Sequence, residues 1–179
     1  MAFIDEHKAK FDNLRASLEI QNRDQLRRKA NGGNSIIFIY PPKEEKLYLN
    51  KLTEFDDQLN LVQIDIAKLL IEFIDEVSIE SIERKYSIFK ATPHKVFLPF
   101  VQRIIKAIQK VNDEGKSPVL VRTGALYGTG IENVNIMENK VVMGLTHPLI
   151  IFYPSKTENG NLYFLNFKPA SKYRCTVID

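Results

Sequence analysis

The chain has 179 residues, of which 44% are apolar and 26% charged, as in an ordinary globular domain, so a largely disordered chain is excluded. Its net charge of +3 is too small to indicate a nucleic-acid-binding protein by itself, and its single cysteine, Cys175, excludes an internal disulfide framework. The first residues lack the basic and apolar regions of a signal peptide, and no stretch approaches the roughly 20 apolar residues of a membrane span. We therefore expect a cytoplasmic protein.

The N-terminal part predicts helices that pack on a larger body. Residues 3–20 carry apolar side chains at helical spacing, at Ile4, Phe11, Leu14 and Leu18, with charged residues between them. A second helical piece runs to about Ala30 and is ended by residues 31–34, Asn-Gly-Gly-Asn. We expect these helices, about residues 3–30, to lie on a sheet formed by the rest of the chain.

Strands and helices then alternate. Residues 35–40 form an apolar run that is typical of a strand buried on both faces. Residues 43–59 have a helical pattern in which Leu47, Leu52 and Phe55 are the expected core anchors. Residues 61–64 predict the next strand, and Asp65 is a candidate cap for a helix that runs through Ile74.

The second half continues this pattern. Residues 79–111 are mostly helical, with a start signal at Thr92-Pro93, and residues 118–121 predict a strand. Residues 131–143 are either a short helix or an irregular crossover. Residues 149–153, stopped by Pro154, residues 162–165 and residues 173–178 predict three more strands, with turns between them too short for a helix. The sequence thus predicts one α/β domain over residues 1–179, a central, mostly parallel sheet flanked by helices, with an antiparallel C-terminal edge.

A glycine-rich turn, residues 124–130, comes directly after the strand at residues 118–121. Gly124, Gly128 and Gly130 could bring backbone amides to a phosphate at this end of a strand. A phosphate-binding loop has a lysine and then a serine or threonine after its last glycine, but Ile131 and Glu132 stand there. The turn is therefore either structural or a degenerate nucleotide site.

Basic residues gather before the glycine pair at residues 32–33. Arg23, Arg27, Arg28 and Lys29 are cations near the C-terminal pole of a helix, where the helix dipole favours them. The alternative is direct DNA contact, in which the protein would act as an accessory DNA-contacting subunit.

The remaining polar residues do not form a catalytic or metal-binding motif. His7, His94 and His147 lack a second histidine or cysteine at metal-ligand spacing. Asp65 lies at the carboxyl end of a strand, where open α/β sheets place their ligands, but a helix cap explains it as well. We expect no catalytic residue, metal or cofactor.

The last strand offers a candidate partner interface instead. Tyr173 and Arg174, which alternate on the predicted strand at residues 173–178, combine apolar area with polar ends, and Tyr153 is a further interface candidate. Cys175, which lies beside this pair, is expected to be a core or edge cysteine.

The C-terminal segments resemble the BrxB family, small proteins of bacterial BREX phage-defence systems. The matching residues are Thr123, Gly124, Tyr127, residues 148–154, Gly160, Leu162, Phe164, Tyr173 and Arg174. Many members have a glycine where this chain has Ser155, and residues 128–130 are extra. The resemblance implies a non-catalytic subunit that acts with an alkaline-phosphatase-like PglZ protein, a methyltransferase and an ATPase.

Overall fold

The computed structural model describes residues 2–89 and 92–179. The α-helices are α1 (Ala2–Leu18), α2 (Arg23–Lys29), α3 (Glu45–Leu59), α4 (Ile66–Val77), α5 (Ile79–Phe89), α6 (Pro93–Val96), α7 (Leu98–Asp113), α8 (Asn133–Met137) and α9 (Lys140–Met143). Single-turn 3-10 helices are η1 (Ile20–Asn22), η2 (Pro42–Glu44) and η3 (Thr123–Leu126). The strands are β1 (Ser35–Tyr40), β2 (Leu61–Asp65), β3 (Ser117–Val121), β4 (Leu149–Glu158), β5 (Asn161–Phe164), β6 (Lys168–Ala170) and β7 (Cys175–Ile178).

One sheet connects all of these strands. Five of them run parallel in the order β2-β3-β4-β1-β7, and β5 and β6 add an antiparallel part beside the far end of β4. The predicted α/β fold, with a mostly parallel sheet flanked by helices, is confirmed, and the predicted antiparallel edge is formed by β5 and β6. The last strand itself, β7, returns to the parallel part and pairs with β1.

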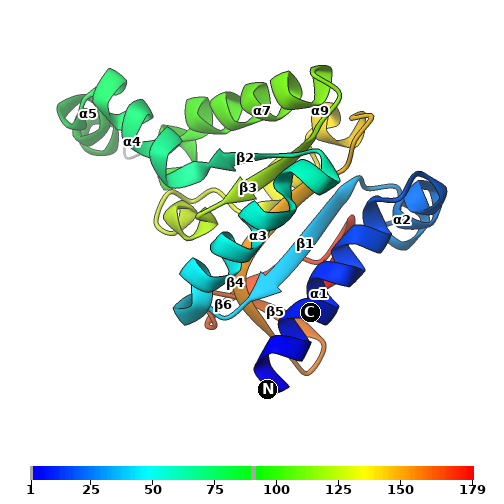
Figure 1. Cartoon of the computed structure of the whole chain (residues 1–179). Coiled ribbons are helices and arrows are strands. Elements are labelled where there is room, and N and C mark those ends of the chain that lie inside the picture. Colours follow the sequence, from blue (N-terminus) through cyan, green and yellow to red (C-terminus); the bar gives the residue numbers. More distant parts are fainter. Residues whose placement is uncertain (1, 90–91) are drawn as a thin grey trace.

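Helices cover both faces of the sheet, so that its central strands are buried throughout. On the first face α1, α2 and α3 pack over Ile36, Phe38 and Phe152, and on the second α4, α7, α8 and α9 pack over Ile37 and Ile151 (Figure 1). Neighbouring residues of β1 thus face opposite cores, as the pleat of a strand requires. The interpretation of residues 35–40 as a strand buried on both faces is correct.

Strand β4 does not stop at Pro154, as the sequence pattern predicts, but continues to Glu158. Up to Pro154 it pairs with β1, and from Ser155 it pairs with β5. Proline has no N–H to donate, and here it stands where β4 exchanges one partner for another. Its carbonyl accepts a hydrogen bond from the backbone N–H of Leu165 (2.7 Å), which ties the end of β5 to β4.

The last strand is shorter than predicted, because Tyr173 and Arg174 form a turn before β7 instead of alternating along it. Arg174 has a left-handed backbone, with φ 58°, which a strand residue does not adopt. Its carbonyl packs directly on Gly33, where a side-chain Cβ would lie 1.9 Å from the carbonyl oxygen. Gly33 therefore allows the turn to lie against the chain that enters β1.

The other differences are local. Residues 131–143 contain two short helices, α8 and α9, and the three-residue strand β6, which contains Pro169, is not predicted by the sequence pattern. Within the helical span at residues 79–111, α6 begins at Pro93 and α7 at Leu98, while residues 90–91 lie outside the described residues.

Candidate functional site

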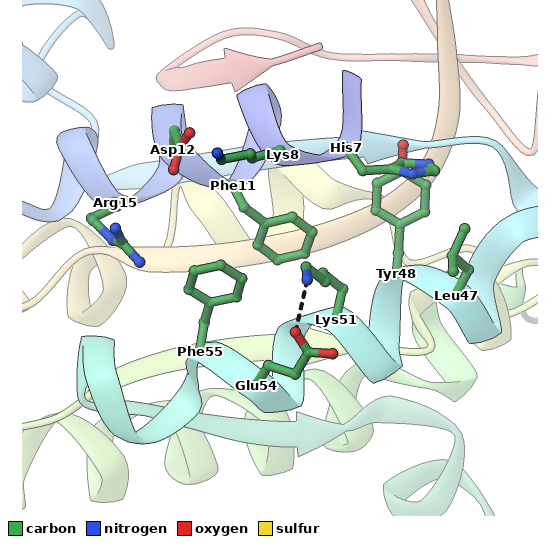
Figure 2. Close-up of a pocket in the computed structure, with 10 residues that line it drawn as sticks. All are labelled: His7, Lys8, Phe11, Asp12, Arg15, Leu47, Tyr48, Lys51, Glu54 and Phe55. Atoms are coloured by element: carbon green, nitrogen blue, oxygen red, sulfur yellow. Dashed lines mark hydrogen bonds and ion pairs between the residues drawn. The ribbon is translucent and has the colours of Figure 1, made fainter. Parts of the chain in front are cut away.

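A groove with an aromatic floor lies between α1 and α3 (Figure 2). Phe11 of α1 stacks on Phe55 of α3, with ring centroids 5.1 Å apart and planes within 10°. Phe11 also contacts Phe38 of β1 at 5.0 Å, so the floor continues into the core of the first face. On α3, Tyr48, Lys51 and Phe55 follow one another at spacings of three and four residues, which places them on the same side of the helix.

Cations stand over the floor. The guanidinium of Arg15 lies 5.3 Å from the centroid of the Phe55 ring, and the ammonium of Lys51 lies 5.9 Å from it. Both distances are in the range of cation–π attraction. Arg15 also donates to Gln58, and Lys51 pairs with Glu54 at 2.7 Å, so the two cations are held beside the ring.

His7 and Tyr48 line the other end of the groove. Their rings meet edge to face at 4.6 Å, and Nε2 of His7 lies 3.4 Å from a carboxylate oxygen of Glu44. Burial, together with the nearby carboxylates, raises the pKa of Tyr48 well above its ordinary value. Leu47 of α3 completes this end and is 44% exposed.

The groove encloses about 470 Å³ and combines an apolar floor with a charged rim. Such a lining holds an apolar side chain of a ligand or partner and orients it through the charges around it. The sequence pattern groups Leu47, Leu52 and Phe55 together as core anchors. Only Leu52 is fully buried, whereas Phe55 and Leu47 border the groove; a helical pattern alone does not tell a core position from the wall of a groove.

At the carboxyl edge of the sheet, Asp65 of β2 meets Arg122, which stands directly after β3, in an ion pair. Asp65 also accepts a hydrogen bond from the backbone N–H of Lys68 (3.0 Å), so it caps α4 as predicted. Partial burial acts to raise the pKa of Asp65, but the hydrogen bonds from Arg122 and Lys68 outweigh it and lower that pKa. Nearby, the hydroxyl of Tyr40 donates to Glu45 (2.7 Å). These groups satisfy one another, which fits a structural role.

The glycine-rich turn (residues 124–130) uses backbone amides to fold on itself. The N–H groups of Ala125, Tyr127 and Thr129 donate to carbonyls within the turn or just before it. At Gly130 a Cβ would lie 2.5 Å from the backbone nitrogen of His94, so this glycine permits close packing against α6. Both observations favour a structural turn over a phosphate site. Gly124 and Gly128 make no close approach of this kind.

The basic cluster is divided by the fold. Arg23 donates to the carbonyl of Thr146 (3.3 Å) and lies 3.2 Å from Nδ1 of His147, and Arg27 donates to the carbonyl of Leu145 (3.4 Å). These two residues hold α2 against the loop before β4. Arg28 and Lys29 remain exposed, so two of the four candidate DNA-contacting cations have structural partners. Burial, together with Arg23, lowers the pKa of His147.

Of the predicted partner-interface residues, one is buried in the structure and the others lie at the surface. Tyr153 is only 3% exposed and stacks on Phe164 at 4.7 Å, so the structure removes it from the interface candidates. Tyr173 is 50% exposed, with the guanidinium of Arg174 at 5.2 Å from its ring, and this pair remains a surface candidate. Cys175 is buried, which raises the pKa of its thiol to about 12.

Comparison of the chain with protein-family models, curated proteins and solved structures found no match. Within residues 2–89 and 92–179, no helix combines the length and apolar character of a membrane span. The same residues contain no group of three or more histidine, cysteine or acidic side chains placed to share a metal ion.

Proposed function

We propose that this chain is a non-catalytic interaction subunit of a BREX-type anti-phage assembly and that it binds a PglZ-like protein. The resemblance of its C-terminal segments to the BrxB family supports the assembly and the partner. The observation that carries the interaction role is the groove between α1 and α3, whose aromatic floor and charged rim suit a protein partner.

The charges around the groove indicate the kind of segment that binds there. Lys8, Arg15 and Lys51 line it with Asp12 and Glu54, and two of the three cations stand over the Phe55 ring. A segment with an apolar side chain flanked by carboxylates places its apolar group on the floor and its acids beside these cations. Complementary charge of this kind speeds association and fixes orientation.

Most of the residues that carry the resemblance belong to the framework. The hydroxyl of Thr123, fully buried, donates to the carbonyl of Phe152 (2.6 Å) and fixes η3 to β4. Leu162 and Phe164 lie in the core of the second face. Tyr127 and Tyr173 are the aromatic exceptions, at 55% and 50% exposed. The resemblance thus supports a shared scaffold, and the exposed tyrosines are further candidate contacts.

The test is co-purification of this chain with a PglZ-like protein, using a matched pair of variants. Leu47→Glu places a carboxylate in the groove, and Leu98→Glu makes the same change on α7, at a side chain of nearly equal exposure (44% and 47%). We expect Leu47→Glu to weaken binding at least about tenfold, because it removes apolar contact and repels an acidic segment. Leu98→Glu leaves the affinity unchanged.

Three results separate the parts of this proposal. Absence of binding by the unaltered chain contradicts the function. Binding that both variants retain keeps the function but moves the contact away from the groove. Binding that Leu98→Glu alone abolishes assigns the contact to α7 instead.

A further inference from the structure

Strand β7 is an edge strand of the parallel sheet. Among the described residues it pairs only with β1, and none of the turn and loop hydrogen bonds between backbone groups involves residues 175–178. Along a strand, successive backbone units turn alternately toward either side, so half of the N–H and C=O groups of β7 point away from β1. Such a row is a ready template for another strand.

A groove of about 500 Å³ runs along this free edge. Thr176 and Ile178 point to the first face of the sheet, since Ile178 belongs to that core, whereas Val177 packs with the second. All three nevertheless line the same groove. The groove is therefore bordered by the backbone edge of β7 and not by one face of the strand. Helix α1 supplies Ala16 to the opposite wall, and α2 supplies Gln25.

The groove is suited to an extended chain. The four residues of β7 offer a backbone edge about 13 Å long. Thr176 lines the groove, and its hydroxyl oxygen is buried and has no hydrogen-bond partner among the described residues. A polar group left in this way costs free energy.

We propose that an extended segment of another protein binds in this groove and adds to β7 as a further strand. The row of free backbone groups provides the hydrogen bonds, and the side chains of the segment alternate between α1 and α2 on one side and the second face of the sheet on the other. This mode of binding is independent of the groove between α1 and α3 and does not need the partner proposed above.

The lining favours a foreign segment over a second copy of this chain. The walls carry Asn13, Ser17, Gln25 and Lys29, which are polar, whereas interfaces between permanent copies of one chain are predominantly apolar. A polar groove beside a strand whose outer edge has no partner strand among the described residues suits reversible capture of a peptide segment.

The experiment begins with random peptides of about ten residues displayed on phage and selected on the intact protein. Ala16 is exposed on α1, so Ala16→Trp fills the groove without disturbing a core, and Ala9→Trp makes the same change at an exposed position outside it. We expect the selected peptides to lose at least about tenfold in affinity on Ala16→Trp and nothing on Ala9→Trp. Hydrogen exchange of the β7 amides slows when a peptide is bound.

N-methylation of a selected peptide provides the specific readout. Two versions of the peptide are compared, one methylated at its odd-numbered and one at its even-numbered backbone nitrogens. Only one of these two sets of N–H groups faces β7, so one version loses binding and the other keeps it. Failure to select any peptide, peptides that bind Ala16→Trp normally, or exchange at β7 that does not change would overturn the inference. So would sedimentation that shows a dimer of the free protein which Ala16→Trp separates, since the edge would then belong to a second copy.

Discussion

The helices that cover the two faces of the sheet attach to it in different ways. On the second face, α7 buries a broad stripe made of Phe100, Val101, Ile104, Ile105, Ile108 and Val111. On the first face, the buried positions of α1 follow one narrow line, at His7, Lys10, Phe11 and Leu14. A groove lies on each flank of α1. The cover of the first face therefore forms both surfaces for which we propose binding partners.

This difference predicts the largest effects on stability. Ile104→Ala and Phe11→Ala each remove a fully buried side chain, and each is expected to cost about 2–5 kcal/mol. Because α7 lies across the second core, Ile104→Ala lowers the free energy of global unfolding and speeds exchange throughout the sheet. Phe11→Ala instead releases α1 locally, so faster exchange is confined to α1 and its neighbours.

Denaturant titration and residue-level hydrogen exchange on both variants measure these two patterns. Hydrogen exchange that is faster throughout the sheet in Phe11→Ala would show that α1 is as strongly coupled to the sheet as α7 is. The two faces of the sheet would then not differ in how their helices attach.

The next largest expected effect concerns β7, the edge strand that lies beside α1 and α2. Gly33→Ala drives a Cβ into the carbonyl of Arg174, against backbone that cannot rotate away, and we expect a loss of about 1–3 kcal/mol with faster exchange in β7. Gly32→Ala is the control, since no atom lies within 4 Å of its Cβ position. Its φ of 79° disfavours alanine by about 1 kcal/mol but leaves β7 in place. Equal exchange in β7 for both variants would contradict the role assigned to Gly33.

Most of the fold could be predicted from the sequence, because its signals are local. The apolar run at residues 35–40, the cap at Asp65, the helix start at Pro93 and the glycines at residues 32–33 each act within a few residues of chain. The end of β4 could not be predicted in this way. Proline ends a strand only where its missing N–H is needed, and at Pro154 the strand is changing partners.

The candidate sites could not be predicted, because they depend on contacts between distant segments. Phe55 and Leu47 have the helical spacing of core residues. They border a groove because of the way α1 packs beside α3, which the sequence pattern does not reveal. In the sequence, Arg23 and Arg27 have the pattern of a nucleic-acid-binding surface. In the fold they donate hydrogen bonds to carbonyls just before β4, which lie more than a hundred residues further along the chain. Tyr153 has the residue type of an interface anchor, but β5 covers it with Phe164.

The smallest expected effect concerns the start of α4, one of the helices that cover the second face of the sheet. Asp65 caps α4 and pairs with Arg122, and these hydrogen bonds keep its pKa below the ordinary value. A lowered pKa in the folded state contributes stability that is present above the ordinary aspartate pKa and is lost as the pH falls through the folded value. In Asp65→Asn the amide oxygen keeps the cap but the charge is absent, so at pH 7 we expect a loss below about 1 kcal/mol. The difference in unfolding free energy between the two proteins disappears at pH values below the folded pKa, and a difference that persists there would assign the effect to packing instead of charge.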